Sequence, residues 1–287
     1  MGQYVGYANR DLRKSNLFIS LQKLIPKHLI SGLIGKIAAS ENRLVKTIFI
    51  SVFKKIYNVS LDNAKRKKSK DYRSFNDFFS RQVELPTSHS SIDKNTIYSP
   101  AEGSISEIGK IQNGQLLQAK GQTYSLTDLA KVDSKLFLNG SFITIYLSPR
   151  NYHRVHLPVS AQLQQTISIP GSLYSVNNKT ARSIKDLFCK NERLVCQFST
   201  SGGPILVILV GALIVASIET SWEGPLSPYK EEQTNNYDLD LLSCQEIGRF
   251  LLGSTVICCF PPNHFILDEN LKIGTELEAC SPIGSVN

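Results

Sequence analysis

The chain has 287 residues, of which 41% are hydrophobic and 20% charged, and its formal net charge is +8. A chain this long and this apolar can bury a substantial core, which excludes an intrinsically disordered protein. No run of about 18 uncharged apolar residues occurs, and the first twenty residues carry four charged side chains without an apolar core before a cleavage site. We therefore expect neither a transmembrane helix nor an export signal.

The positive charge is concentrated at the amino end. Residues 1–73 hold 16 basic and 4 acidic side chains, a net charge of +12, whereas the other 214 residues carry a net charge of −4. An evenly basic nucleic-acid-binding protein has no such asymmetry. We expect no nucleic-acid partner, and residues 1–73 are predicted to form a region of their own.

Basic amphipathic helices, two or three in number, are predicted between residues 17 and 59. Apolar residues recur there at helical spacing, with lysine and arginine between them. The two apolar sets are Leu17, Leu21, Leu24 and Ile25, and Leu44, Ile48, Val52 and Ile56. An exposed basic linker, residues 65–70, follows. The helices fit two interpretations: a cap on a core whose lysines face water, or a membrane-docking surface that lies on anionic lipid.

Residues 74–287 have the composition of a β domain. Short segments rich in Val, Ile, Thr and Tyr are separated by Gly, Pro and Asn. The predicted strand segments are Ser104–Ile111, Phe142–Leu147, Leu163–Ile169, Leu194–Phe198, Ile205–Ile218 and Ser254–Phe260. Within Pro204–Ile218, the most apolar stretch, Gly211 favours a buried hairpin or strand pair. The predicted fold class is α+β, with amino-terminal amphipathic helices on a mostly antiparallel β catalytic body.

The six cysteines show no C-x-x-C pair and no spacing typical of a metal site. In a chain without an export signal they are expected to be reduced and mostly buried thiols. The predicted compartment is therefore the cytosol.

Two segments of the β region are dense in reactive side chains. Tyr98–Gly103 places Glu102 in a turn just before a strand, where a carboxylate is often an ordinary turn residue. Leu147–Pro158 holds His153 and His156 between two prolines. This histidine pair suits general acid/base catalysis, structural hydrogen bonding or a zinc pair, although no third metal ligand is indicated.

A third segment, Gly248–Ile257, places Gly253 and Ser254 where the chain enters an apolar strand. It does not match the G-x-S-x-G pattern of α/β-hydrolases. A bare Gly-Ser-Thr is typical of a turn.

Taken together, the three segments resemble the phosphatidylserine decarboxylase proenzymes of bacteria and mitochondria. That family has Ser-Pro-Ala-Asp-Gly, Tyr-His-Arg-x-His and Leu-Gly-Ser-Thr motifs, and this chain has Ser99–Gly103, Tyr152–His156 and Leu252–Thr255 in the same order. The resemblance extends from about residue 14 to residue 280. One position departs from it: the family aspartate is Glu102 here, one methylene longer. A compensating backbone shift or a slower reaction is expected because orientation of an imidazole requires a short hydrogen bond.

The resemblance implies self-cleavage. Ser254 attacks the carbonyl carbon of Gly253, and the resulting ester breaks to leave a β chain of residues 1–253 and an α chain of residues 254–287. Ser254 becomes a pyruvoyl group. His156 matches the general base, Glu102 is expected to orient it, and His153 is assigned to proton handling during decarboxylation or to substrate positioning.

The resemblance also implies the activity. The pyruvoyl group, covalent and derived from Ser254, forms a Schiff base with phosphatidylserine and decarboxylates it to phosphatidylethanolamine without an external cofactor or metal. The expected partners are phosphatidylserine and an anionic membrane surface, and the two cleaved chains form an α/β heterodimer whose further oligomerisation is left open. The expected location is peripheral, on the cytoplasmic face of the cell membrane.

Three alternatives remain open from the sequence. A lapsed family member, disabled by Glu102, would act as a non-enzymatic lipid-binding module. A serine hydrolase would use the same residues on a separate substrate. A related enzyme would decarboxylate a different lipid with an amino-acid headgroup.

Overall fold

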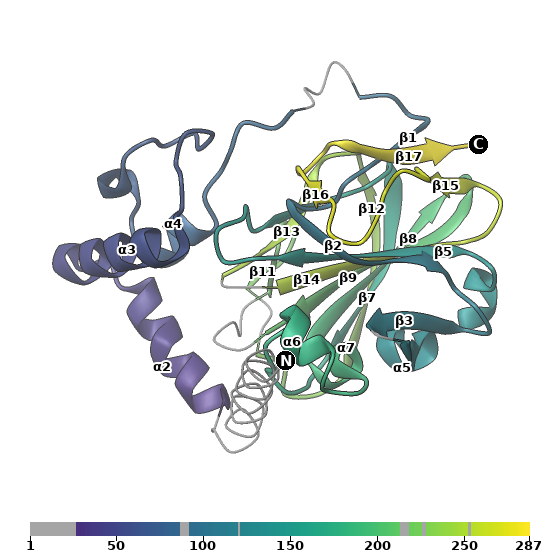
Figure 1. Cartoon of the computed structure of the whole chain (residues 1–287), viewed down its shortest axis with the longest axis horizontal. Helices are drawn as coiled ribbons and strands as arrows, with labels where there is room; N and C mark the ends of the chain where they lie inside the picture. The colour runs from purple at the N-terminus through teal and green to yellow at the C-terminus, as the bar shows by residue number, and fades with distance from the viewer. Residues whose placement is uncertain (1–26, 87–91, 120, 213–217, 226–227, 252–253) are drawn as a thin grey trace, which may run out of the picture.

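A sheet of eight strands forms the centre of the molecule (Figure 1). The computed structural model describes residues 27–86, 92–119, 121–212, 218–225, 228–251 and 254–287. In spatial order the strands are β12 (Gln233–Leu241), β7 (Ala161–Ile169), β8 (Arg193–Thr200), β9 (Gly203–Gly211), β14 (Ser254–Phe260), β5 (Ser141–Leu147), β2 (Gly103–Lys110) and β16 (Glu276–Leu277). Every neighbouring pair is antiparallel.

Three smaller sheets accompany it. The four-stranded sheet has the order β11 (Gly224–Pro225), β10 (Ile218–Thr220), β13 (Glu246–Phe250) and β6 (Arg154–His156). The three-stranded sheet contains β1 (Thr96–Tyr98), β17 (Pro282–Val286) and β15 (Phe265–Leu267), and the two-stranded sheet contains β3 (Gln115–Ala119) and β4 (Gln122–Ser125). All these pairs are antiparallel as well, so the predicted α+β class with a mostly antiparallel body is confirmed.

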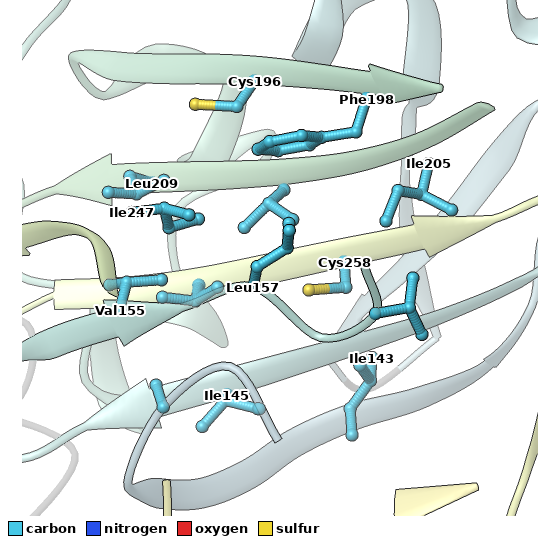
Figure 2. Close-up of a cluster of buried hydrophobic side chains, with 14 of the residues drawn as sticks. Ile143, Ile145, Val155, Leu157, Cys196, Phe198, Ile205, Leu209, Ile247 and Cys258 are labelled. Atoms are coloured by element: carbon cyan, nitrogen blue, oxygen red, sulfur yellow. The ribbon is translucent and has the colours of Figure 1, made fainter. Parts of the chain in front are cut away.

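The central strand β14 is buried on both faces. Side chains alternate across a strand, and Val256 and Cys258 enter one apolar cluster while Ile257 and Cys259 enter the other. Figure 2 shows the first cluster, in which residues of β5, β8, β9 and β14 meet Val155 of β6. The second cluster is covered by β3, β4 and the short helices α5 (Leu126–Ala130), α6 (Asn178–Ala181) and α7 (Leu187–Lys190). A 3-10 turn, η3 (Ser134–Phe137), also contributes to it. Burial on both faces explains the continuous apolar run of β14.

The predicted strand segments are confirmed with one correction. The prediction of a buried hairpin or strand pair within Pro204–Ile218 is right about two strands and wrong about a hairpin. Strand β9 lies in the eight-stranded sheet, whereas β10 pairs with β11 and β13 in the four-stranded sheet. Residues 213–217, which connect them, lie outside the described residues.

The helical region contains α2 (Lys27–Ala39), α3 (Arg43–Tyr57), the 3-10 turn η1 (Ser69–Asp71) and α4 (Phe75–Phe79). The side chain of Asn42 caps α3 by accepting hydrogen bonds from the backbone N–H groups of Leu44 and Val45. The helices share an aromatic core that includes Phe75, Phe78 and Phe79. Two of the predicted helices are therefore present, and the part predicted before residue 27 lies outside the described residues.

Helix α3 exposes the apolar stripe that the sequence predicts. Leu44, Ile48, Val52 and Ile56 are 74%, 64%, 49% and 67% exposed, while Ile50 on the opposite face is buried. The stripe is therefore not part of the core of the described chain. None of the helices in the described ranges has the length and apolar character needed to cross a bilayer.

All six cysteines are free thiols, as predicted. Five are buried, and Cys189 is partly buried. The expected exposure of the basic linker is also found for its four lysines, whereas Ser69 is partly buried and Arg66 is partly buried in an ion pair with Asp77 at 2.6 Å.

Candidate active site

The carboxylate of Glu102 is bound to the loop that carries the two histidines. Its Oε1 accepts a hydrogen bond from Nδ2 of Asn151 at 2.9 Å. Oδ1 of Asn151 in turn accepts from the backbone N–H and the hydroxyl of Ser148, at 2.9 and 2.5 Å. Gly103 allows this approach, because a Cβ there would clash with the carbonyl oxygen of Tyr146 on β5. Asn151 therefore connects the first predicted motif to the end of β5.

Backbone hydrogen bonds link the three segments that carry the motifs. The N–H of His156 donates to the carbonyl of Pro100 at 2.7 Å, which joins the second motif to the first. The N–H of Phe250 donates to the carbonyl of His153 at 2.9 Å. Strand β13, which leads toward Ser254, also pairs with β6. Segments separated by about 50 and 100 residues therefore converge at one place.

Both ring nitrogens of His156 have defined neighbours. Nδ1 lies 2.8 Å from the carbonyl oxygen of Cys244, and Nε2 lies 3.0 Å from the hydroxyl of Tyr152. Since a carbonyl only accepts, Nδ1 is the donor, and Nε2 of the neutral ring accepts from Tyr152. Burial raises the pKa of the Tyr152 hydroxyl, which therefore stays protonated. His156 is thus held with its basic nitrogen toward Tyr152.

His153 is enclosed more completely. Its ring stacks on Phe79 with the ring centroids 4.0 Å apart, and Nε2 lies 3.1 Å from the carbonyl oxygen of Ser148. Burial, assisted by the positive charge of Arg81, lowers the pKa of His153 to about 3. The ring is therefore neutral at physiological pH. Nε2 donates to Ser148, and Nδ1, an acceptor in this tautomer, has no hydrogen-bond partner in the described part of the chain.

Ser254 is the first residue of β14 and is fully buried. Its backbone partners are Leu147 on β5 and Gly211 on β9, so it lies beside the residue that precedes Ser148. Its hydroxyl makes no hydrogen bond to any described residue. A buried hydroxyl without a partner is costly, and in the described chain Ser254 shares this feature with Thr255 and Thr144 among others. Gly253 lies outside the described residues.

Two cavities border the loop of the second motif. The larger has a volume of about 740 Å³ and is lined by Glu102, Asn151 and Arg81. The rest of its wall includes some of the residues in the ranges 58–63, 83–86 and 276–279. The smaller, of about 470 Å³, is lined by Ser148 and Asn151 and reaches Ile56 and Tyr57 at the end of α3. One predicted site residue, Glu102, therefore lines the larger cavity, and the smaller one lies between the end of α3 and the residues Ser148 and Asn151.

The hydrogen bonds of the predicted site residues differ from those expected from the sequence. Glu102 was expected to orient His156, but its carboxylate binds Asn151, and the imidazole faces Cys244 and Tyr152. The hydroxyl of Ser254 makes no hydrogen bond to either histidine. No group of three or more His, Cys, Asp and Glu side chains in the described ranges is placed to hold a metal ion.

Two residues that sequence reasoning did not single out belong to this site. Asn151 directly precedes the second motif, in the segment Leu147–Pro158, where its position between the prolines was the only available signal. Arg81 lies outside all three motifs, and only the fold brings it to residues 150–153.

Comparison with known proteins settles the family. The family model described as phosphatidylserine decarboxylase matches residues 75–285, and a second, described as PSD, matches residues 17–58. The chain belongs to the phosphatidylserine decarboxylase family. The resemblance of the three motifs to this family is thereby confirmed.

Individual relatives agree over nearly their whole length. A phosphatidylserine decarboxylase proenzyme of Alcanivorax borkumensis is 43% identical over 95% of this chain and 97% of its own. The proenzyme of Acinetobacter baylyi is 44% identical over 90% and 92%, and that of Aliivibrio salmonicida is 43% identical over 94% and 98%. These relatives carry the names of proenzymes, and none of these names supports the alternative of a lapsed lipid-binding module.

Proposed function

We propose that this chain is a pyruvoyl-dependent phosphatidylserine decarboxylase that matures by cutting itself between Gly253 and Ser254. The observation that carries the proposal is the placement of Ser254 in the structure. Ser254 starts the central strand with a buried hydroxyl, unpartnered in the described chain, and its backbone pairs with Leu147, where the segment that carries both histidines begins.

Self-cleavage needs a nucleophile and a base. The Oγ of Ser254 adds to the carbonyl carbon of Gly253 and forms an ester as the Gly253–Ser254 amide breaks. Elimination then expels the carboxylate of Gly253 and leaves dehydroalanine at position 254, which takes up water and loses ammonia to give the ketone. His156 is assigned as the base, since its Nε2 is the acceptor when Nδ1 donates to the carbonyl of Cys244. Delivery of the proton requires rearrangement of the Ser254 hydroxyl or of the Tyr152–His156 pair, because the two residues make no hydrogen bond in the uncut chain.

The pyruvoyl group, once formed, supplies a ketone that condenses with primary amines and withdraws electrons when CO2 leaves. The residues around it have separate tasks. His153, neutral and fully buried, is assigned to proton handling or substrate positioning, because its Nδ1 is an acceptor without a partner among the described residues. Glu102 is assigned to the electrostatics of the site, acting through Asn151 on the loop that carries both histidines.

The cleaved chains are expected to stay together as a heterodimer. The α chain would supply β14 between β9 and β5, β16 beside β2, and β17 between β1 and β15. Each of these neighbours other than β15 belongs to the β chain, so separation would break the central sheet.

The basic amino-terminal region, residues 1–73, is proposed to dock on an anionic membrane surface at the cytoplasmic face. The exposed stripe of α3, whose residues were given above, runs beside the lysines of the same helix. An apolar stripe flanked by cations is typical of a helix that lies in the plane of a bilayer. The stripe ends at Ile56, which lines the smaller cavity with Ser148 and Asn151. A lipid headgroup would therefore have a short path from the bilayer to the site.

A pair of variants tests the cleavage. Ser254→Ala removes the hydroxyl and is expected to yield one chain of 31.9 kDa on denaturing electrophoresis, whereas the parent yields two. Thr255→Val is the matched control, because the Thr255 hydroxyl is also buried without a partner in the described chain and valine keeps its shape. The control should be cut normally. An uncut parent, or a cut Ser254→Ala variant, would overturn the proposal.

A further inference from the structure

The side chain of Arg81 is buried beside the candidate active site. It lies two residues after α4, and the residue is only 3% exposed. Nη2 donates to the carbonyl oxygen of Arg150 at 2.8 Å, and the guanidinium lies 5.8 Å from the centroid of the Phe78 ring. Nε and Nη1 have no hydrogen-bond partner among the described residues. The position of the side chain is thus fixed, while part of its hydrogen-bonding capacity is unused.

No anion neutralises this cation within the described chain. The ion pairs found there within 4.0 Å join Arg66 to Asp77, Arg154 to Glu246 and Arg249 to Glu219. Burial lowers the pKa of the Arg81 guanidinium. The negative charge of Glu102 acts in the opposite direction and raises that pKa, but Glu102 forms no ion pair with Arg81. Buried charges in proteins are normally paired or hydrogen-bonded. An unpaired guanidinium in this setting indicates a missing anionic ligand.

The cavity gives such a ligand access. Arg81 lines the larger cavity together with Glu102 and Asn151, two residues of the candidate site. The guanidinium also acts electrostatically on His153, which stacks on Phe79 two residues before Arg81. A ligand bound at Arg81 would thus occupy the same cavity as Glu102 and Asn151, beside the loop that carries His153 and His156.

We propose that Arg81 is a substrate-binding residue whose free N–H groups bind an oxyanion of the phosphoserine headgroup. The inference rests on the proposed function, because that function supplies a substrate with two anionic groups, a phosphodiester and a carboxylate. The phosphodiester is favoured. A cation bound to the carboxylate would stabilise a charge that disappears when CO2 leaves, and so would bind the ground state better than the transition state. The phosphodiester keeps its charge throughout the reaction.

The test uses the full chain with Ser254→Ala, so that binding is measured without cleavage or turnover. Short-chain phosphatidylserine and short-chain phosphatidylethanolamine are titrated in monomeric form by calorimetry. The second ligand has the phosphodiester but no carboxylate. Arg81→Gln is added to this background, and Arg73→Gln serves as the control because Arg73 is exposed, lies in the same segment and does not line the cavity.

The expected result is a loss of about tenfold or more in affinity for both lipids on Arg81→Gln, from a charge-assisted hydrogen bond. Arg81→Lys should recover part of it, and Arg73→Gln should change neither affinity. A loss for phosphatidylserine alone would transfer the contact to the carboxylate and overturn the phosphodiester assignment. Unchanged affinity for both lipids would overturn the whole inference.

Two further readouts keep the outcome interpretable. The thermal unfolding midpoint of each variant shows whether it is folded. If Arg81→Gln is not folded, Arg81→Lys replaces it, and its affinity for both lipids is expected to fall a few-fold. An unchanged affinity of Arg81→Lys would then contradict the inference. Failure of the proposed function would appear elsewhere, as an uncut parent chain, and leaves this binding measurement unaffected.

Discussion

Glu102 and Asn151 are joined by a 2.9 Å hydrogen bond that ties the first motif to the loop of the second. Glutamate is one methylene longer than the family aspartate. Its carboxylate therefore accepts a hydrogen bond from the side-chain amide of Asn151 and not from an imidazole. The carboxylate still contributes its negative charge to the larger cavity, and Asn151 transmits its position to Ser148 at the end of β5.

Asn151→Ala is expected to slow self-cleavage about tenfold or more. The variant removes a hydrogen bond to a charged group, worth about 1.5–3 kcal/mol, and frees the loop that carries His153 and His156. The measurement is the fraction of cut chain over time after synthesis. Asn63→Ala, which changes an asparagine of the same cavity, is the control. Equal rates for both variants would show that the Glu102–Asn151 contact does not matter for cleavage.

His156→Ala is expected to reduce the rate of self-cleavage by a factor on the order of 10²–10⁴, the usual contribution of a positioned general base. His264→Ala is the control, because His264 is exposed. Both proteins are followed by denaturing electrophoresis. Cleavage of His156→Ala at the parental rate would remove this residue from the reaction and direct attention to His153.

His153 is expected to make the fold less stable in mild acid. Its pKa is about 3 in the folded chain and near 6.5 when unfolded, so the unfolded chain takes up the proton first. Above pH 6.5 the residue contributes no pH dependence, and stability falls as the pH drops from 6.5 toward 3. Between pH 7 and pH 5 the loss is about 2 kcal/mol by linkage.

The measurement is urea unfolding of the Ser254→Ala chain at both pH values, with and without His153→Gln. The His153→Gln chain should show a pH dependence smaller by that amount, although its stability at pH 7 also falls because a packed ring is lost. His264→Gln should leave the pH dependence as it is. An identical pH dependence in the His153→Gln chain and its parent would show that folding does not lower the pKa of His153.

Membrane association is expected to depend on the apolar stripe of α3 and on ionic strength. Leu44→Ser combined with Ile48→Ser should weaken flotation with anionic vesicles about tenfold or more, since each side chain contributes about 1.5–3 kcal/mol when buried. Leu136→Ser with Leu138→Ser removes exposed leucines elsewhere and should have no effect. Binding of the parent should weaken in high salt because surface charges are screened. Salt-independent binding that survives the α3 changes would contradict docking by this surface.

The sequence predicted the elements of this fold better than the contacts between them. The apolar run of β14 identified a buried strand because its composition alone is decisive, and the helical spacing of Leu44, Ile48, Val52 and Ile56 identified α3. Periodicity could not say which way that stripe faces, since a core face and a lipid face have the same pattern. The hairpin at Pro204–Ile218 failed for a related reason: β10 pairs with β11 and β13 and not with β9, and composition does not encode the choice of partner.

The site shows the same limit. The motifs named Glu102, His153, His156 and Ser254, but the hydrogen bonds of Glu102 and His156 depend on side-chain directions that spacing does not encode. Arg81 could not be found from sequence, because a single arginine beside α4 gains meaning only when the fold buries it against residues 150–153.

The mass of the carboxy-terminal fragment tests the central claim most directly. The account predicts a fragment of 34 residues that begins at position 254, is lighter by one ammonia than the fragment simple hydrolysis would give, and reacts with a carbonyl reagent. A fragment that begins with unmodified serine, or a chain that remains whole while well folded, would contradict it.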